Sequence, residues 1–328
     1  MNNFEIYGTL GPSCCNQETI EQMFRVGMTG MRLNLSHCNL NERKDWIAAF
    51  HHAKKNCGID AQLLIDMKGP ELRLGKVSEQ TIAKDTIFSL NQEFLPKPII
   101  ENIEINDILK IDDGKIECIV IENKNEIVCK VVRGGTLKPN KSIAIKDKTI
   151  TGDVLTFSDI ENLKQAKEYG VTGIMQPFVR NKEDLFQVKE ILKQNNMTDI
   201  KIYAKIENMD GVHHLESIIP YCDHIVIARG DLGNATGLTY LPVVQKRIEE
   251  VCKEKNCPYM VVTEMLSSMI ENEIPTRAEV SDIFHAVYHG ASSVMLTNET
   301  AIGKYPIAAM NVLSEVVKEA KKIKRRIK

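Results

Sequence analysis

The chain has 328 residues, of which 43% are hydrophobic and 26% are charged, and its formal net charge at pH 7 is -2. This composition is typical of a soluble globular protein with a large core. A net charge so close to zero argues against a nucleic acid or an acidic membrane surface as the main partner.

The cysteines favour a reducing environment. There are nine of them, with no Cys-x-x-Cys pair and no histidines at zinc-ligand spacing; Cys252 and Cys257 come nearest to such a pair. The adjacent Cys14 and Cys15 cannot readily bridge to each other. No basic N-terminal region precedes an apolar run, and no stretch approaches ~20 apolar residues, so neither a signal peptide nor a membrane span is predicted. We therefore expect a cytoplasmic protein.

Short runs rich in β-branched residues alternate with amphipathic segments along the chain, which is typical of repeated βα units and a parallel sheet. Eight alternating units predict an α/β protein of the (β/α)8 TIM barrel class. The predicted strands are residues 4–10, 28–35, 61–66, 172–176, 200–205, 224–228, 258–263 and 292–297. The predicted helices are residues 16–26, 41–56, 158–169, 181–194, 240–255, 276–289 and 306–327.

Two helix starts carry the spacing of a capping box, in which an N-cap hydroxyl precedes an acidic residue by three positions. One pairs Ser158 with Glu161, and the other pairs Thr276 with Glu279. The last helix ends in six basic residues between Lys321 and Lys328. An acidic partner would explain them, but cations favour a helix C-terminus in any case.

The alternation of strands and helices is interrupted after the third strand. Residues 76–152 lose the helical period, and Asp113-Gly114 predicts a hairpin turn within them. Removing this segment leaves ~250 residues, enough for one barrel. We therefore predict a barrel from residues 1–75 and 153–328, and a small all-β domain inserted after strand 3 over residues 76–152.

Charged side chains follow two consecutive apolar runs. Lys205 and Glu207 end the run that begins at Ile200, and Asp231 follows the next run after Arg229-Gly230. Barrel enzymes build their active sites from such strand ends, and two carboxylates suit Mg²⁺ together with a phosphorylated or enolic substrate. A structural alternative is an ion pair between Lys205 and Glu207 that stabilises the strand end.

Four further clusters lie where other strands end. They are Met31–His37, Leu64–Arg73, Thr263–Met265 and Leu296–Ala301. With these motifs in order, the chain resembles pyruvate kinases over nearly its whole length outside the insert. The shared motifs are Gly11-Pro12-Ser13, Arg-x-Asn-x-Ser-His from Arg32, Asp-x-Lys-Gly-Pro-Glu-x-Arg from Asp66, Lys-Ile-Glu-Asn from Lys205, Ala-Arg-Gly-Asp-Leu-Gly from Ala228, Pro-Thr-Arg-Ala-Glu from Pro275 and Glu-Thr-Ala from Glu299.

The resemblance implies a (β/α)8 barrel with an all-β lid domain after strand 3, and transfer of a phosphoryl group from phosphoenolpyruvate to ADP with Mg²⁺ and K⁺. By analogy, Glu207 and Asp231 hold magnesium, and Lys205 and Arg32 neutralise the phosphoryl oxygens. Such transfer depends mostly on positioning and charge, so this set is chemically sufficient.

The resemblance also implies a potassium site made of Asn34, Ser36, Asp66 and the backbone carbonyl of Met67, with Glu71 matching the glutamate linked to potassium dependence. This oxygen-rich set carries a single full negative charge, as a monovalent hard ion requires. The alternative for Asn34 and Ser36 is that they are turn residues that cap the next helix.

The remaining site residues follow by the same analogy. Gly230 and Asp231 start a short helix whose N–H groups bind the substrate carboxylate. Thr263 lies near the face of the enolate that is protonated, although alone it would be interpreted as a helix cap. Arg73 and His37 contact the nucleotide phosphates. Asn34 is assigned to the nucleotide side as well as to potassium.

The sequence departs from the family pattern mainly on the nucleotide side. Glu264 replaces a glutamine, Asn298 a glycine and Ile302 a lysine, and residues 234–237 lack the usual Glu-x-Pro. Loss of one cation near a phosphate removes ~1–3 kcal/mol, or roughly one to two decades of affinity. The sequence therefore predicts an unusual phosphoryl acceptor or poor turnover with ADP.

The chain stops after the eighth helix, where relatives usually continue into an α/β regulatory domain. We therefore expect no activation by a sugar bisphosphate, and we expect a homo-oligomer or a partner chain to cover exposed barrel surface. Two other functions remain open. One is a magnesium-dependent lyase acting on a pyruvate enolate, but such an enzyme needs neither the insert nor the motif at Arg32. The other is a non-catalytic regulatory paralogue. The presence together of Arg32, Lys205, Glu207 and Asp231 argues against it.

Overall fold

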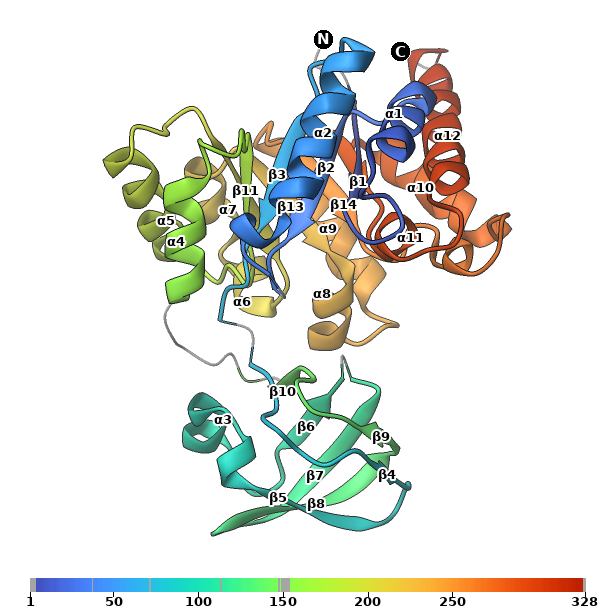
Figure 1. The fold of residues 1–328 in the computed structure, drawn as a ribbon. Helices are drawn as coiled ribbons and strands as arrows, with labels where there is room; N and C mark the ends of the chain where they lie inside the picture. Colours follow the sequence, from blue (N-terminus) through green and yellow to red (C-terminus); the bar gives the residue numbers. More distant parts are fainter. Residues whose placement is uncertain are drawn as a thin grey trace. The chain divides into compact units, whose positions relative to one another are not determined.

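The computed structural model describes residues 4–36, 38–70, 72–112, 114–146, 148 and 154–326. The chain forms two compact units. One consists of Met1–Gly69, Leu155–Leu232 and Thr239–Lys328, and the other of Pro70–Val154 with Gly233–Leu238. The elements of both are labelled in Figure 1.

The first unit contains a closed barrel of eight parallel strands, in the order β1-β15-β14-β13-β12-β11-β3-β2. All eight strands predicted from the sequence are present, with small shifts of their ends. The barrel class is therefore confirmed. The strands are β1 (Glu5–Thr9), β2 (Gly30–Asn34), β3 (Gln62–Asp66), β11 (Gly173–Gln176), β12 (Lys201–Ile206), β13 (His224–Ala228), β14 (Tyr259–Val262) and β15 (Ser293–Met295).

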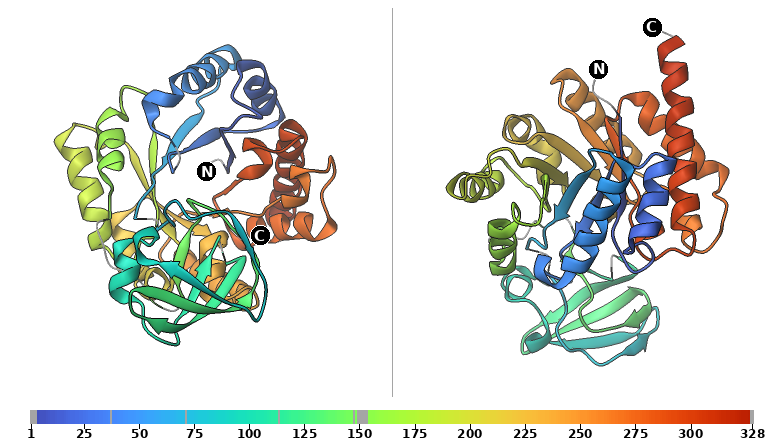
Figure 2. Two further views of the ribbon diagram at one scale, coloured as in Figure 1. Left: turned by 60° about the horizontal axis from the view of Figure 1, so that its bottom comes forward. Right: turned by 45° about the horizontal axis from the view of Figure 1, so that its top comes forward.

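Helices surround the strands, as both views in Figure 2 show. The predicted helix at 41–56 starts as the 3₁₀ turn η1 (Leu40–Arg43) before it becomes α2. Within the described residues, no helix is long and apolar enough to cross a membrane. The other barrel helices are α1 (Gln17–Val26), α2 (Lys44–Cys57), α4 (Phe157–Gln165), α5 (Glu183–Gln194), α6 (Met209–His213), α7 (Leu215–Ile218), α8 (Arg229–Thr236), α9 (Leu241–Glu254), α10 (Arg277–His289), α11 (Asn298–Ala301) and α12 (Pro306–Arg326), with 3₁₀ turns η3 (Ile219–Tyr221) and η4 (Ser267–Ile270).

One predicted capping box is confirmed and the other is wrong. Thr276 caps α10 and exchanges hydrogen bonds with Glu279. Helix α4 starts before Ser158, because Thr156 is its N-cap and Asp159 completes the box. Asp159 is fully buried, and it also accepts the backbone N–H groups of Lys68 and Gly69, which ties the start of α4 to the end of β3.

Side chains along the strands alternate between the two faces of the barrel wall. On β12, Tyr203 belongs to the apolar cluster inside the barrel, whereas Ile202, Ala204 and Ile206 belong to the layer packed with the helices. The same period turns Lys205 inward near the carboxyl end of β12. On β3, Leu64 is inside, so Asp66 also faces inward. Alternation therefore directs charged residues of different strands to one end of the barrel.

The second unit contains a five-stranded sheet in the order β10-β6-β7-β8-β5 and a two-stranded sheet β4-β9. Antiparallel pairing of β6 with β7 confirms the predicted hairpin between them. The core of the second unit is apolar and separate from that of the barrel. The elements are β4 (Gln80–Ile82), β5 (Ile87–Asn91), η2 (Gln92–Phe94), α3 (Lys97–Asn102), β6 (Ile108–Ile111), β7 (Ile116–Asn123), β8 (Glu126–Arg133), β9 (Gly135–Leu137) and β10 (Ile143–Ile145).

Candidate functional site at the carboxyl ends of the barrel strands

Four charged side chains from three strands meet inside the barrel. Asp66 Oδ2 accepts hydrogen bonds from Arg32 Nε at 3.0 Å and Nη2 at 2.6 Å. Lys205 Nζ lies 3.2 and 3.1 Å from the two Asp66 oxygens and 2.9 Å from Glu207 Oε1. The arrangement brings together two cations and two carboxylates, so its formal charges cancel. The ion pair between Lys205 and Glu207 that the structural alternative predicted is present.

Burial makes this charge cluster electrostatically strong. Asp66 and Glu207 are only 2% and 3% exposed. Burial alone would raise the pKa of Asp66, but the charges of Lys205 and Arg32 outweigh it, and the pKa lies below its usual value. Burial would lower the pKa of Lys205, yet Asp66 and Glu207 raise it above its usual value. Asp66 is therefore ionised and Lys205 protonated at neutral pH.

Glu207 is held by a backbone group that the sequence did not reveal. Its Oε2 accepts the N–H of Phe178 at 2.7 Å. Phe178 follows β11 and has a positive φ of 52°, which is uncommon for a residue other than glycine. This strained turn after β11 points a donor at the carboxylate and fixes the orientation of Glu207. A Gln-Pro-Phe sequence gives no obvious signal for such a role.

The predicted potassium ligands come from neighbouring strands. Asn34 and Asp66 are direct partners in the register of β2 and β3. Asn34 Oδ1 accepts the N–H of Ser36 at 3.1 Å, so the turn interpretation of these residues also applies. Neither residue caps the next helix, because the N-cap residue of η1 is Asn39. Met67 is buried beside them at the end of β3, whereas Glu71 lies outside the described residues.

Gly230 and Asp231 lie in the first turn of α8, as predicted, directly after β13. A Cβ atom added at Gly230 would lie 3.2 Å from Thr263 Cγ2. Thr263 follows β14, so consecutive strands place these residues in near contact. Asp231 is half-buried. Because β13 pairs with β12, helix α8, which follows β13, starts next to the carboxyl end of β12.

Thr263 has an unusual backbone conformation. Its φ is 75°, and that of Glu264 is 54°. Such values are strained in a β-branched residue and persist only where surrounding contacts impose them. Arg229 supplies these contacts: its Nε and Nη2 donate to the Thr263 carbonyl at 3.1 and 2.7 Å, and its Nη1 pairs with Asp282 at 2.6 Å. Thr263 caps no helix, so that interpretation is wrong.

Of the predicted nucleotide contacts, Arg73 belongs to the second unit, where its Nη1 donates to the Asn140 carbonyl at 2.8 Å. His37 lies outside the described residues. Three positions that depart from the family pattern belong to the barrel unit, after β14 and β15. Glu264 and Asn298 are exposed, and Ile302 is 57% exposed.

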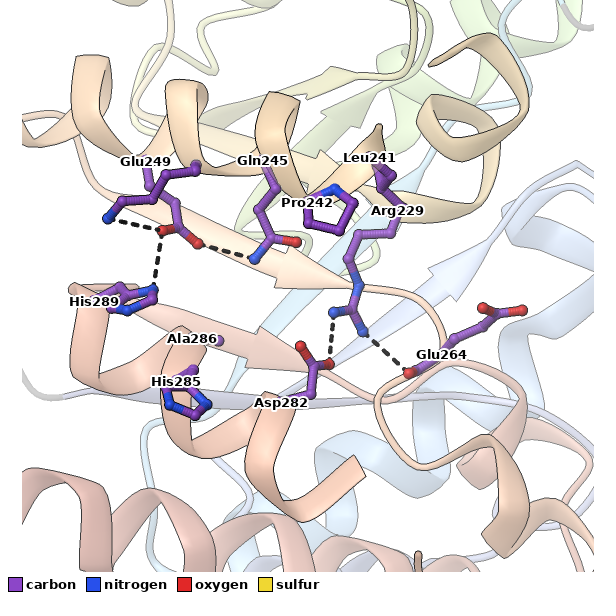
Figure 3. A pocket seen from close by; sticks show the side chains of 11 residues that line it. Arg229, Leu241, Pro242, Gln245, Glu249, Glu264, Asp282, His285, Ala286 and His289 are labelled. Atoms are coloured by element: carbon purple, nitrogen blue, oxygen red, sulfur yellow. Dashed lines mark hydrogen bonds and ion pairs between the residues drawn. The ribbon is translucent and has the colours of Figure 1, made fainter. Parts of the chain in front are cut away.

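A pocket of about 370 Å³ lies on the outer side of the barrel between α9 and α10 (Figure 3). Its polar lining includes Glu249, which pairs with His289 at 3.3 Å. Arg229 and Asp282 line its other end, so the contacts that hold Thr263 extend to this surface. The pocket lining includes no member of the charge cluster.

The potential metal ligands are few. Within the ranges that the structure describes, no group of three or more histidine, cysteine or acidic side chains has an arrangement that could hold a metal ion. Glu207 and Asp231 are two carboxylates at the ends of neighbouring strands. A hard cation that uses one or two protein carboxylates completes its shell with substrate and water oxygens.

The fold and the charge cluster define a TIM-barrel protein whose site lies at the carboxyl ends of its strands, the location of active sites in this class. A family model described as "Pyruvate kinase, barrel domain" matches residues 1–310. The chain belongs to the pyruvate kinase family.

Relatives named pyruvate kinase align along nearly the whole chain. The protein of Clostridium perfringens is 32% identical over 98% of this chain and 70% of its own length. The Thermotoga maritima protein is 33% identical over 98% of this chain and 72% of its own length. This chain covers 57% of the Bacillus licheniformis protein, at 32% identity. These relatives indicate an enzyme of the kinase type.

Proposed function

We propose that this chain transfers the phosphoryl group of phosphoenolpyruvate to a nucleoside diphosphate, with ADP as the ordinary acceptor. The observation that carries the proposal is the convergence of Arg32 and Lys205 on Asp66. Both cations are held within one buried site, against their mutual repulsion, by a carboxylate. In phosphoryl transfer, cations placed in advance stabilise charge on the equatorial oxygens without reorganisation.

The chain's own residues then have separate roles. Lys205 and Arg32 bind the phosphoryl oxygens and exchange part of their pairing with Asp66 for the substrate. The N–H groups at Gly230 and Asp231 bind the substrate carboxylate. Thr263 faces the enolate carbon that takes up a proton to give pyruvate. Its strained backbone, held by Arg229, fixes the position of its hydroxyl.

Two ions complete the proposal. Glu207 and Asp231 would hold Mg²⁺, and the donor set fits because both are carboxylates at adjacent strand ends. When bound, the ion neutralises charge on the transferred group. Potassium would be held by oxygens of Asn34, Ser36 and Asp66 and by the carbonyl of Met67. Asn34 and Asp66 already lie side by side across β2 and β3.

The acceptor side of the site departs from the family pattern. Glu264 and Asn298 are exposed, and Ile302 exposes an apolar side chain after α11 where the family has a lysine. We therefore propose that ADP binds more weakly than in typical relatives, by about one to two decades. An acceptor with less negative charge would be affected less.

The test is a coupled assay of pyruvate release from phosphoenolpyruvate, run with several nucleoside diphosphates and with K⁺ present or replaced by Na⁺. We expect release that depends on Mg²⁺ and K⁺ and a high KM for ADP. Binding of phosphoenolpyruvate, followed by calorimetry with Mn²⁺ present, separates substrate binding from turnover. Absence of both binding and release would reject the proposal, and binding without release would favour a regulatory paralogue.

A further inference from the structure

Three of the nine cysteines meet at the amino-terminal ends of β13 and β14, opposite to the strand ends that form the charge cluster. Cys222 precedes β13, Cys252 lies in the last turn of α9, and Cys257 precedes β14. The two strands are neighbours, with Ile225 N–H bonded to the Pro258 carbonyl at 3.0 Å. Residues that are far apart in sequence are thereby brought to one place.

The end of α9 fixes the geometry of the first pair. Asn256 is left-handed with a φ of 54°. Its N–H bonds to the Lys253 carbonyl at 3.2 Å, and the Cys257 N–H bonds to the Cys252 carbonyl at 2.8 Å. These two bonds define a Schellman motif, in which the side chains of the two residues five positions apart, joined by the outer bond, commonly contact each other. Here both of these residues are cysteines.

The third thiol completes the cluster. The thiol of Cys257 lies close enough to those of Cys222 and Cys252 to interact electrostatically with both. Interaction with these two thiols lowers the pKa of Cys257, and the same interactions together with burial raise the pKa values of Cys222 and Cys252. Cys222 and Cys257 are half-buried, whereas Cys252 is fully buried. A small oxidant therefore reaches Cys257 before it reaches Cys252.

The chemistry of this cluster is that of thiols. Among the described residues, no three metal-binding side chains are arranged to hold an ion, and this includes the three cysteines. All nine cysteines are reduced in the structure. Neighbouring thiols, one of which has a lowered pKa and is partly exposed, have the features of a redox-sensitive site.

We propose that Cys222, Cys252 and Cys257 form a peroxide-sensitive site, in which Cys257 is oxidised first and then forms a disulfide with one of its two neighbours. The Cys257 thiolate attacks a peroxide oxygen, so that an S–O bond forms, the O–O bond breaks and the leaving oxygen is protonated to water. A neighbouring thiol then displaces the second oxygen as water, and an S–S bond forms. Two thiols and one hydrogen peroxide give one disulfide and two waters.

This site is independent of the proposed transfer reaction, because none of its residues belongs to the charge cluster. In a reducing cytoplasm such a disulfide is transient and is reversed by cellular thiols. A bond between Cys222 and Cys257 would join the segments that enter β13 and β14. The amino-terminal face of the barrel would then carry a reversible modification, although the charge cluster lies at the other face.

Peptide mapping tests the proposal on the full chain. The folded protein is treated with equimolar hydrogen peroxide, remaining thiols are alkylated, and the protein is digested with trypsin without reduction. The three cysteines fall on separate peptides, residues 206–229, 248–253 and 256–277. We expect the last peptide to be linked to one of the other two, and dithiothreitol to release it. Cys57, half-buried in its own peptide of residues 56–68, is the internal control and should be alkylated about tenfold more.

Variants separate the cluster from general oxidation. Cys257→Ser should abolish the cross-link, whereas Cys57→Ser should leave it intact. Thermal unfolding checks that both variants fold, and Cys257→Ala repeats the test if serine is not tolerated. The proposal fails if Cys257 stays alkylatable at the level of Cys57, if it proceeds to sulfinic acid without a link, or if the link survives Cys257→Ser.

Discussion

The guanidinium of Arg229 holds the backbone of Thr263 in a strained conformation. Nε and Nη2 both donate to the Thr263 carbonyl, and Asp282 holds the opposite edge of the guanidinium. The first residue of α8 thus fixes the turn after β14. Because Gly230 comes next, two neighbouring βα loops position each other at the proposed substrate site.

Arg229→Lys keeps the charge but loses the planar fork that bonds to the Thr263 carbonyl and to Asp282. Loss of charge-assisted bonds worth ~1.5–3 kcal/mol should lower kcat by about tenfold to a hundredfold. Arg247→Lys, at an exposed position of α9, is the control and should have no effect. Equal rates for both variants in the pyruvate-release assay would show that Arg229 does not position Thr263.

Lys205→Met removes the cation that bridges Asp66 and Glu207. The rate of phosphoryl transfer should fall by at least about a thousandfold, because no other ammonium lies in the charge cluster. Circular dichroism should show an intact fold. Lys201→Met, at the other end of the same strand, should retain activity. Normal turnover by Lys205→Met would refute the catalytic role of Lys205.

Gly230→Ala places a methyl group 3.2 Å from Thr263 Cγ2. Relief of this contact must displace α8 or Thr263, so KM for phosphoenolpyruvate should rise by about tenfold, equivalent to ~1.4 kcal/mol. Thr263→Ser removes Cγ2 and keeps the hydroxyl. The double variant should therefore recover most of the lost affinity relative to Gly230→Ala; additive losses would show that the two side chains do not interfere.

Asp66 links stability to pH. Its folded pKa is lowered, so its stabilising contribution is present above its usual pKa and is lost as pH falls through the lower folded value. Wild-type stability should therefore decrease below about pH 4, and Asp66→Asn should decrease less. At neutral pH, Asp66→Asn should cost about 3–5 kcal/mol because Arg32 and Lys205 lose their partner. Urea titrations measure the free energy of unfolding of each variant. Asp60→Asn, which removes the carboxylate of an exposed ion pair with Lys54, should lower it little.

Ile302→Lys restores a cation to an exposed position after α11. We expect KM for ADP to fall by about tenfold or more, with KM for phosphoenolpyruvate unchanged. Ile274→Lys adds the same charge at another exposed isoleucine and controls for net charge. If both variants improve ADP binding equally, the effect is one of overall electrostatics and the assignment of Ile302 to the acceptor side is wrong.

The sequence by itself determined the barrel. Apolar runs of strand length, separated by amphipathic segments, gave all eight strands, because burial on both faces of a parallel strand requires a continuous apolar run. It also determined which charged residues follow those strands. Since side chains alternate along a strand, Arg32, Asp66 and Lys205 had to face the same interior once the barrel closed.

Only the tertiary structure decided how these residues are paired and supported. Asp66 binds both cations because the closed barrel places β3 next to β2, which carries Arg32, and only one strand away from β12, which carries Lys205; this order depends on contacts distant in sequence. The N-cap of α4 was predicted at the wrong residue because Asp159 also serves the backbone after β3. The roles of Phe178 and Arg229, and the approach of Cys222 to Cys257, could not be predicted for the same physical reason. Each depends on packing between separate βα units, whereas sequence periodicity reports only on one unit at a time.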